Sequence, residues 1–148
     1  MRKPDRFFTT MILWGYKDIA LLDIWTVEHI VSGASIGGFL KFYSDKFLEI
    51  NRNRSLLFFT FLMFLAYLWE SVEHYLETGM GGDAVMHWFY GVEHWSNRLI
   101  SDPLMLVIGC LIVLRFPVVK WPTRIFSVSW LFIHIFVFPH SMYLHDIF

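Results

Sequence analysis

The chain has 148 residues, of which 56% are hydrophobic, 20% aromatic and 17% charged. A water-soluble domain of this length rarely has such a composition, because its core is too small to bury 16 Phe, seven Trp and six Tyr side chains. The formal net charge of -1 excludes a strongly basic surface for nucleic acid, and the single cysteine, Cys110, excludes an intramolecular disulfide. We therefore expect one integral membrane domain over residues 1–148.

The N-terminal segment, residues 1–22, combines a basic start with a short apolar stretch. The apolar residues from Phe7 to Tyr16 are too few to span a bilayer, and Lys17 and Asp18 follow without a small-residue cleavage site. We expect this segment to stay in the mature protein as a short helix lying in the membrane interface.

Four later stretches are long and apolar enough to cross a bilayer, which requires about 20 residues. The predicted spans cover residues 24–43, 55–77, 99–119 and 122–144. A turn at Gly79–Asp83 and an interfacial helix over Val85–Trp95 separate the second span from the third. The expected fold class is all-α: an integral membrane bundle of about four transmembrane helices, with short interfacial helices at the N-terminus and in the second loop.

The basic residues indicate an orientation. They gather around the first and third loops, at Lys41, Lys46, Arg52, Arg54, Arg115, Lys120 and Arg124. The second loop holds only Arg98, and Lys and Arg are enriched in cytoplasmic loops. We therefore predict that the second loop faces away from the cytoplasm, in a bacterial inner membrane. The bases of the N-terminal segment do not follow this rule.

Acidic residues and histidines gather at one end of the predicted bundle. Because the spans alternate in direction, the start of the first, the end of the second, the start of the third and the end of the fourth share one membrane face. An unpaired carboxylate as deep as Glu70 costs several kcal/mol in a membrane, so it needs a partner or a function. The predicted metal ligands are His29, Glu70, His74 and Asp102, and the predicted supporting residues are Glu28, Glu73, Glu93, His94 and Asn97.

Helical spacing indicates which of these groups can meet. His29, Gly33 and Gly37 recur every four residues, which places the histidine on a small-residue face that a neighbouring helix can approach closely. Glu70 and His74 share a stripe of the second span. Imidazole and carboxylate together suit a divalent zinc, manganese or iron ion. A buried hydrogen-bonded network that only holds the helices together is the structural alternative.

Haem is the alternative cofactor, because small helical membrane bundles can hold it between axial histidines. The histidines within predicted spans are His29, His74 and His134. Zinc, manganese or iron is the first prediction for the cofactor, and haem the second.

The polar residues also resemble a known family. Asp23-x-Trp25-Thr26-x-x-His29-Ile30-x-x-Gly33, Trp69-Glu70-x-x-Glu73, Gly82-Asp83, Asn97 and Ser101-Asp102 with Gly109 are similar to motifs of the VanZ-like group of small polytopic membrane proteins. The resemblance covers residues 23–117 and implies about four spans with intramembrane His, Glu, Asn and Asp. In this chain, residues 87–95 separate the Gly-Asp pair from Asn97, a departure from the family pattern.

Two classes of function follow. The first is a membrane protein with a polar, metal-binding pocket near its non-cytoplasmic face, acting on or binding a lipid-linked or envelope molecule. The second is a non-enzymatic subunit of a larger membrane complex, whose polar groups serve as contacts between helices. The expected partners are membrane lipids and either a second copy of the chain or a larger membrane complex, with no nucleic acid. The sequence leaves open whether the chain catalyses a reaction.

Overall fold

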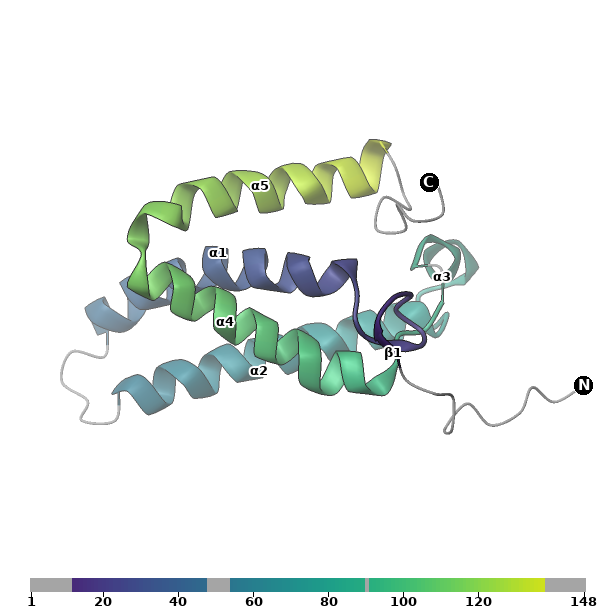
Figure 1. Cartoon of the computed structure of the whole chain (residues 1–148), viewed down its shortest axis with the longest axis horizontal. Coiled ribbons are helices and arrows are strands. Elements are labelled where there is room, and N and C mark those ends of the chain that lie inside the picture. Colours follow the sequence, from purple (N-terminus) through teal and green to yellow (C-terminus); the bar gives the residue numbers. More distant parts are fainter. Residues whose placement is uncertain (1–11, 48–53, 90, 138–148) are drawn as a thin grey trace, which may run out of the picture.

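The computed structural model describes residues 12–47, 54–89 and 91–137, and it is mostly helical. Five α-helices follow a short two-stranded ribbon (Figure 1). The helices are α1 (Ile24–Phe47), α2 (Arg54–Glu77), α3 (Asp83–Phe89), α4 (Asp102–Arg115) and α5 (Lys120–Phe132). A π-helical turn, Asn97–Ser101, leads into α4, and a second one, Ile133–Val137, extends α5.

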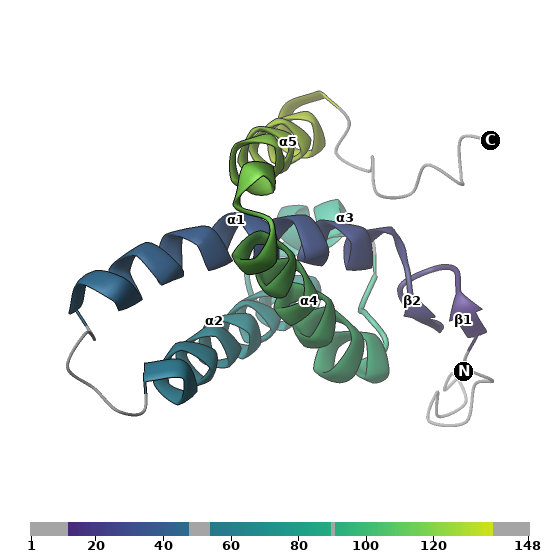
Figure 2. The same ribbon diagram turned by 60° about the vertical axis from the view of Figure 1, so that its left-hand side comes forward.

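The four long helices alternate in direction, as the sequence predicts. The start of α1, the end of α2, the start of α4 and the end of α5 therefore lie at one end of the molecule, where α3 and the ribbon are also found (Figure 1). Helix α1 packs against both α4 and α5, and α5 lies on the side of α1 away from α2 (Figure 2). Among the described residues, two of the four predicted spans are long and apolar enough to cross a membrane, namely Ser55–Glu77 and Asn97–Arg115.

The predicted N-terminal interfacial helix is wrong over residues 12–22. These residues form two short parallel strands, β1 (Ile12–Trp14) and β2 (Ala20–Leu22), joined by a turn in which Ile19 and Ala20 donate to the carbonyl of Tyr16. Lys17, within this turn, contacts Glu77, and the Lys17 carbonyl accepts a 2.7 Å hydrogen bond from the backbone of His94. In residues 12–22, contacts with distant parts of the chain therefore outweigh the local preference for a helix. Residues 1–11 lie outside the described part of the chain.

The other boundaries need smaller corrections. The third span stops at Arg115 and not at 119, because Phe116 leaves the helix and Pro117 begins a separate 3₁₀ turn, Pro117–Val119. The helix predicted over Val85–Trp95 ends at Phe89. The fourth span is helical from Lys120 to Val137, and its predicted end, 138–144, lies outside the described residues. The turn after α2 is confirmed, with Gly79 and Gly82 at positive φ.

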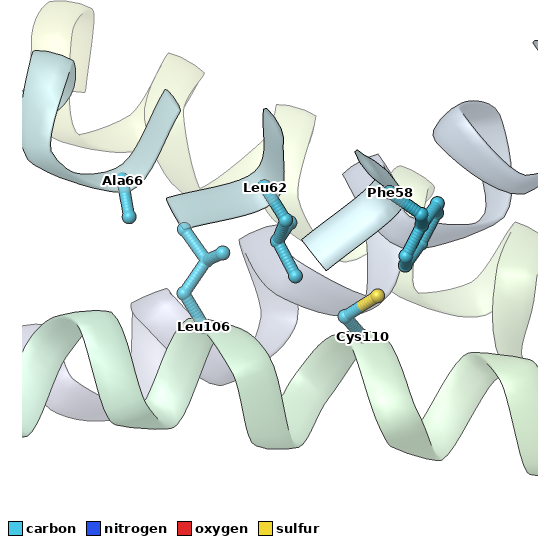
Figure 3. Close-up of a cluster of buried hydrophobic side chains, with 5 residues drawn as sticks. All are labelled: Phe58, Leu62, Ala66, Leu106 and Cys110. Atoms are coloured by element: carbon cyan, nitrogen blue, oxygen red, sulfur yellow. The ribbon is translucent and has the colours of Figure 1, made fainter. Parts of the chain in front are cut away.

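Side-chain hydrogen bonds begin α1, and a cluster of apolar side chains packs α2 against α4. Asp23 Oδ1 accepts from the Thr26 amide at 3.1 Å, and Thr26 Oγ1 accepts from the Asp23 amide at 3.0 Å, which closes the N-terminus of α1. The buried apolar cluster joins α2 to α4 (Figure 3). Its members are Phe58, Leu62, Ala66, Leu106 and Cys110.

Small residues bring α1 and α4 together. A β-carbon added to Gly33 would collide with the backbone carbonyl of Leu106, and one added to Gly109 would collide with the carbonyl of Ile30. Gly37 is similarly close to Cys110. The predicted small-residue face of the first span is thus confirmed, and its partner is α4.

Candidate metal centre

Three buried side chains from three helices converge at the polar end of the molecule. Nε2 of His29 lies 3.3 Å from Oδ2 of Asp102 and 3.8 Å from Oε1 of Glu70. One ligand atom from each residue lies within 4.8 Å of the others, and all three side chains are buried. Ligands that share one ion at about 2.1 Å lie about 3 to 4 Å apart. The group can therefore hold a metal ion after a small adjustment.

The fold places each of these residues on a fixed helical segment. His29 lies on α1, one turn before Gly33, where α1 touches the backbone of α4. Asp102 begins α4 directly after the π-helical turn, and Pro103 follows in the first turn, where proline removes no helical hydrogen bond. Glu70 lies two turns before the end of α2. π-helical turns are frequent at functional sites.

Several buried polar atoms around this group have no hydrogen-bond partner among the described residues. They include both oxygens of Asp102, Oε2 of Glu70, both amide atoms of Asn97 and the hydroxyl of Ser101. A buried polar atom left without a partner costs about 1 to 3 kcal/mol, and native proteins contain few of them. Carboxylate oxygens that lack donors are the atoms a cation would bind.

The charge balance around the group is also unfavourable without a cation. Within the described part of the chain, the buried lysine and arginine side chains are Lys17 and Arg98, and the buried histidines are His29 and His134. The buried carboxyl groups number six, namely Asp23, Glu70, Glu73, Glu77, Glu93 and Asp102. Buried charges are stable only when they are paired, protonated or bound to a metal. Four negative charges would remain if all six carboxyls were ionised, so a divalent ion together with bound protons, or protons alone, must balance this region.

Arg98 connects the group to the second loop. Its guanidinium pairs with Glu77, lies 2.9 Å from Nδ1 of His74 and 3.4 Å from Oε2 of Glu93, and its Nε lies 4.0 Å from Oε2 of Glu70. Sequence reasoning did not select this residue. Its one available signal was that it is the single basic residue of a loop rich in acids.

Lys17 is the second basic residue that sequence reasoning missed. Its side chain is only 2% exposed and pairs with Glu77, which also accepts the backbone N–H of Glu93 at 3.1 Å. A lysine next to an aspartate in a short turn gives no sign of burial. The contact depends on the fold and could not be derived from the sequence.

Two acids just outside the helical spans have perturbed protonation. Burial raises the pKa of Glu93 well above its usual range, and the nearby carboxyls of Asp102 and Glu73 raise it further. A protonated Glu93 can donate a hydrogen bond to Asp102. Burial also raises the pKa of Asp23, against the lowering effect of its hydrogen bonds with Thr26. The region therefore retains protons when no cation is bound.

The structure places His74 apart from the metal group, although it was a predicted ligand. Its ring contacts Arg98, and the residue is exposed on the surface of α2. Among the predicted supporting residues, Glu73, Glu93 and Asn97 are buried at the same end, and Nδ1 of His94 lies 2.7 Å from the Ser96 hydroxyl. The predicted roles of these residues, as metal ligands or as supporting residues, stay predictions.

The histidines of the haem alternative are spread over different surroundings. His29 lies in the carboxylate group and His74 on Arg98, whereas the His134 ring lies 4.9 Å from that of Trp25 and 4.4 Å from that of Trp88. Ligation of haem by His29, His74 or His134 stays a prediction.

A cavity of about 480 Å³ adjoins the metal group. Most of its wall is apolar and comes from α1, α2 and α5, with leucines such as Leu62, Leu65 and Leu131. His29 lines the cavity as well as belonging to the metal group. The cavity is therefore an apolar space with a polar, metal-competent end.

No family model, curated protein or solved structure matches this chain. Its functional interpretation therefore depends on the geometry described above.

Proposed function

We propose that the chain is a membrane protein that binds one divalent metal ion through His29, Glu70 and Asp102. The observation that carries the proposal is the convergence of these three buried side chains from α1, α2 and α4, with ligand atoms within 4.8 Å of one another. The carboxylate oxygens of Asp102 support it, because among the described residues only a protonated Glu93 would donate a hydrogen bond to them, whereas a metal ion would satisfy both oxygens.

The donor set favours zinc, manganese or iron. One imidazole and two carboxylates are ligands that all three ions accept. Three protein ligands leave at least one coordination position open, as in catalytic zinc sites, where it holds water or substrate. The open position would lie near the cavity, because His29 also lines the cavity wall.

We further propose that the chain forms a bundle of four transmembrane helices in a bacterial inner membrane, with the metal near the non-cytoplasmic face. Large apolar side chains on the outside of the helices support this placement, including Phe61 and Phe64 on α2 and Phe132 on α5, each at least half exposed. Only 22% of the most apolar window of α2 is buried inside the molecule, so lipid would cover the rest.

A relationship to the VanZ-like proteins is part of this proposal. The residues that carry the resemblance include His29, Glu70, Asn97 and Asp102, and they gather at one end of the helices. Together with the apolar cavity, they support a protein that binds or acts on an amphiphile, such as a lipid-linked or envelope molecule.

Elemental analysis of the protein purified in detergent tests the metal site. We expect about one equivalent of zinc, manganese or iron, lost in His29→Ala and in Asp102→Asn. His87→Ala is the matched control, because His87 lies exposed on α3 and should leave the metal content unchanged. Since His74 lies outside the group in the structure, His74→Ala should also keep the metal.

Two results would contradict the proposal. If the wild-type protein contains no stoichiometric metal after purification and reloading, the group is a hydrogen-bonded network that holds the helices together. If His74→Ala loses the metal while Glu70→Gln keeps it, the ligand set is different from the one proposed.

The second candidate function is a structural subunit of a larger membrane complex. The apolar outer face of α5, with Ile125, Val128 and Phe136 each 65% or more exposed, would suit a partner helix as well as lipid. Purification in a mild detergent separates the two functions. A monomer or homodimer that keeps its metal would exclude an obligatory partner.

A further inference from the structure

The cavity contains a second polar centre that is separate from the metal group. The carboxylate oxygen Oε1 of Glu28 accepts a hydrogen bond from the Ser32 hydroxyl at 2.5 Å and another from the Ser127 hydroxyl at 3.3 Å. Ser32 lies on α1 and Ser127 on α5, the two helices that run side by side in Figure 1. Glu28, Ser32 and Ser127 all line the cavity.

Glu28 is not used by the proposed metal site. It is adjacent to His29 in the chain, but consecutive residues of a helix point about 100° apart. Its described hydrogen-bond partners are the two serine hydroxyls, which are neutral donors. Two donors on one oxygen hold the carboxyl group in place at the cavity wall.

The cavity wall offers Glu28 no counter-ion among the described residues. None of its lining residues is a lysine or an arginine, its histidines are His29 and His134, and the hydrogen bonds to the Glu28 carboxyl come from the two serines. A carboxylate that faces a largely apolar space without a cation is unfavourable. A positively charged ligand would remove this cost, whereas an anionic one would increase it.

Aromatic side chains share the cavity wall with Glu28. Trp25 precedes Glu28 by one turn of α1, and Trp130 follows Ser127 by one turn of α5, and both tryptophans line the cavity together with Trp69 of α2. Tryptophan attracts cations over its ring face better than the other aromatic side chains, and aromatic cages are a known way to recognise quaternary ammonium groups.

We propose that the cavity binds a cationic amphiphile, with its ammonium head group paired to Glu28 among Trp25, Trp69 and Trp130 and its apolar tail against the leucines of α2 and α5. This inference rests on the proposed function, because it specifies the charge of the amphiphile that the cavity accepts. It concerns residues that are not metal ligands, so it can fail while the metal site stands.

Binding of three probes with the same tail tests the inference. The full chain in an uncharged maltoside detergent is titrated with decyltrimethylammonium, decyl sulfate and decanol, and tryptophan fluorescence reports binding. We expect the ammonium probe to bind at least about tenfold more tightly than the sulfate. Equal affinities would overturn the inference and leave the amphiphile site intact, whereas no binding of any probe would overturn both.

Substitutions test whether Glu28 causes the preference for the ammonium probe. Glu28→Gln should weaken binding of the ammonium probe about tenfold and leave that of decanol unchanged, since the side chain keeps its shape but loses its charge. Asp83→Asn, which removes an exposed charge on α3, is the matched control and should bind like the wild type. If Glu28→Gln does not fold, Trp130→Leu should show a several-fold loss for the ammonium probe alone. An unchanged preference in the folded variant would overturn the assignment.

Discussion

Nε2 of His29 lies 3.3 Å from Oδ2 of Asp102, and this contact joins α1 to the first residue of α4. It depends on the close approach of the two helices. Gly33, one turn after His29, and Gly109, two turns after Asp102, both touch backbone atoms of the opposite helix. The glycines therefore set the distance between two of the proposed metal ligands.

Gly33→Ala should separate these helices. Its added β-carbon would collide with the carbonyl of Leu106, and a backbone atom cannot move aside without the helix. We expect the free energy of unfolding to fall by about 1 to 3 kcal/mol, with weaker metal binding. Thermal denaturation and metal content of the detergent-solubilised protein measure both effects.

Gly38→Ala is the matched control on the same helix. Its β-carbon would meet the flexible side chain of Lys120 at 3.1 Å, which can move. Alanine also favours a helix over glycine, so this variant should be as stable as the wild type. Equal stability of Gly33→Ala and Gly38→Ala would show that the glycine contact does not hold α1 against α4.

Arg98→Met should be among the most destabilising single changes at the polar end. It would leave the carboxyls of Glu77 and Glu93 without their shared basic partner in a buried region. Removing one member of a buried ion pair typically costs about 3 to 5 kcal/mol. Chemical denaturation in mixed micelles would measure the change in unfolding free energy.

Arg98→Lys should lose less stability than Arg98→Met. Lysine keeps the charge but cannot contact His74 and the carboxyls with one planar group. Arg115→Met is the control, because Arg115 is exposed at the other end of α4. If Arg98→Met unfolds no more readily than Arg115→Met, the ion pairs do not stabilise the fold.

The sequence was sufficient to predict the long helices, because each is an apolar run bounded by polar or helix-breaking residues. The alternating directions of these helices were also sufficient to predict that His29, Glu70 and Asp102 lie at one end. The ends were less predictable. Lys17, in the ribbon over residues 12–22, pairs with Glu77, which lies 60 residues further along the chain, and no local sequence pattern indicates that contact.

The details of the polar end required three-dimensional information. Spacing placed Glu70 and His74 on one stripe of α2, but the structure turns Glu70 inward and leaves His74 exposed beside Arg98. From the sequence, each basic residue indicates only on which side of the membrane its loop lies. It therefore could not show that Arg98 and Lys17 are buried among the carboxyls.

Acid should release the proposed metal ion. Imidazole and carboxylate groups bind metal only after losing their protons, so falling pH favours protonation of His29, Glu70 and Asp102 over ligation. We expect metal release below about pH 5, because protons then compete with the ion for the ligand atoms. Dialysis at stepped pH, followed by elemental analysis and reloading at pH 7, measures it. Metal retained at pH 3 would contradict ligation by these residues.

Glu93 should make the stability of the metal-free protein depend on pH. Burial and the neighbouring carboxyl of Asp102 raise the pKa of Glu93 well above its ordinary value of 4.5. Above about pH 4.5 the unfolded chain has lost a proton that the folded protein keeps. The free energy of unfolding therefore falls as pH rises from this value, until the pH exceeds the pKa in the folded protein.

Glu93→Gln should remove this contribution. Glutamine cannot ionise, so the variant should gain stability relative to the wild type as pH rises from 5 to 8 in chelator-treated protein. Thermal denaturation at each pH gives the difference, and Asp83→Asn, an exposed acid on α3, should follow the wild-type profile. Parallel profiles for Glu93→Gln and the wild type would mean that Glu93 ionises in the folded protein as it does in the unfolded chain. In that case Glu93 could not donate a hydrogen bond to Asp102 at neutral pH, and the carboxyls of the polar end would need a cation to balance them.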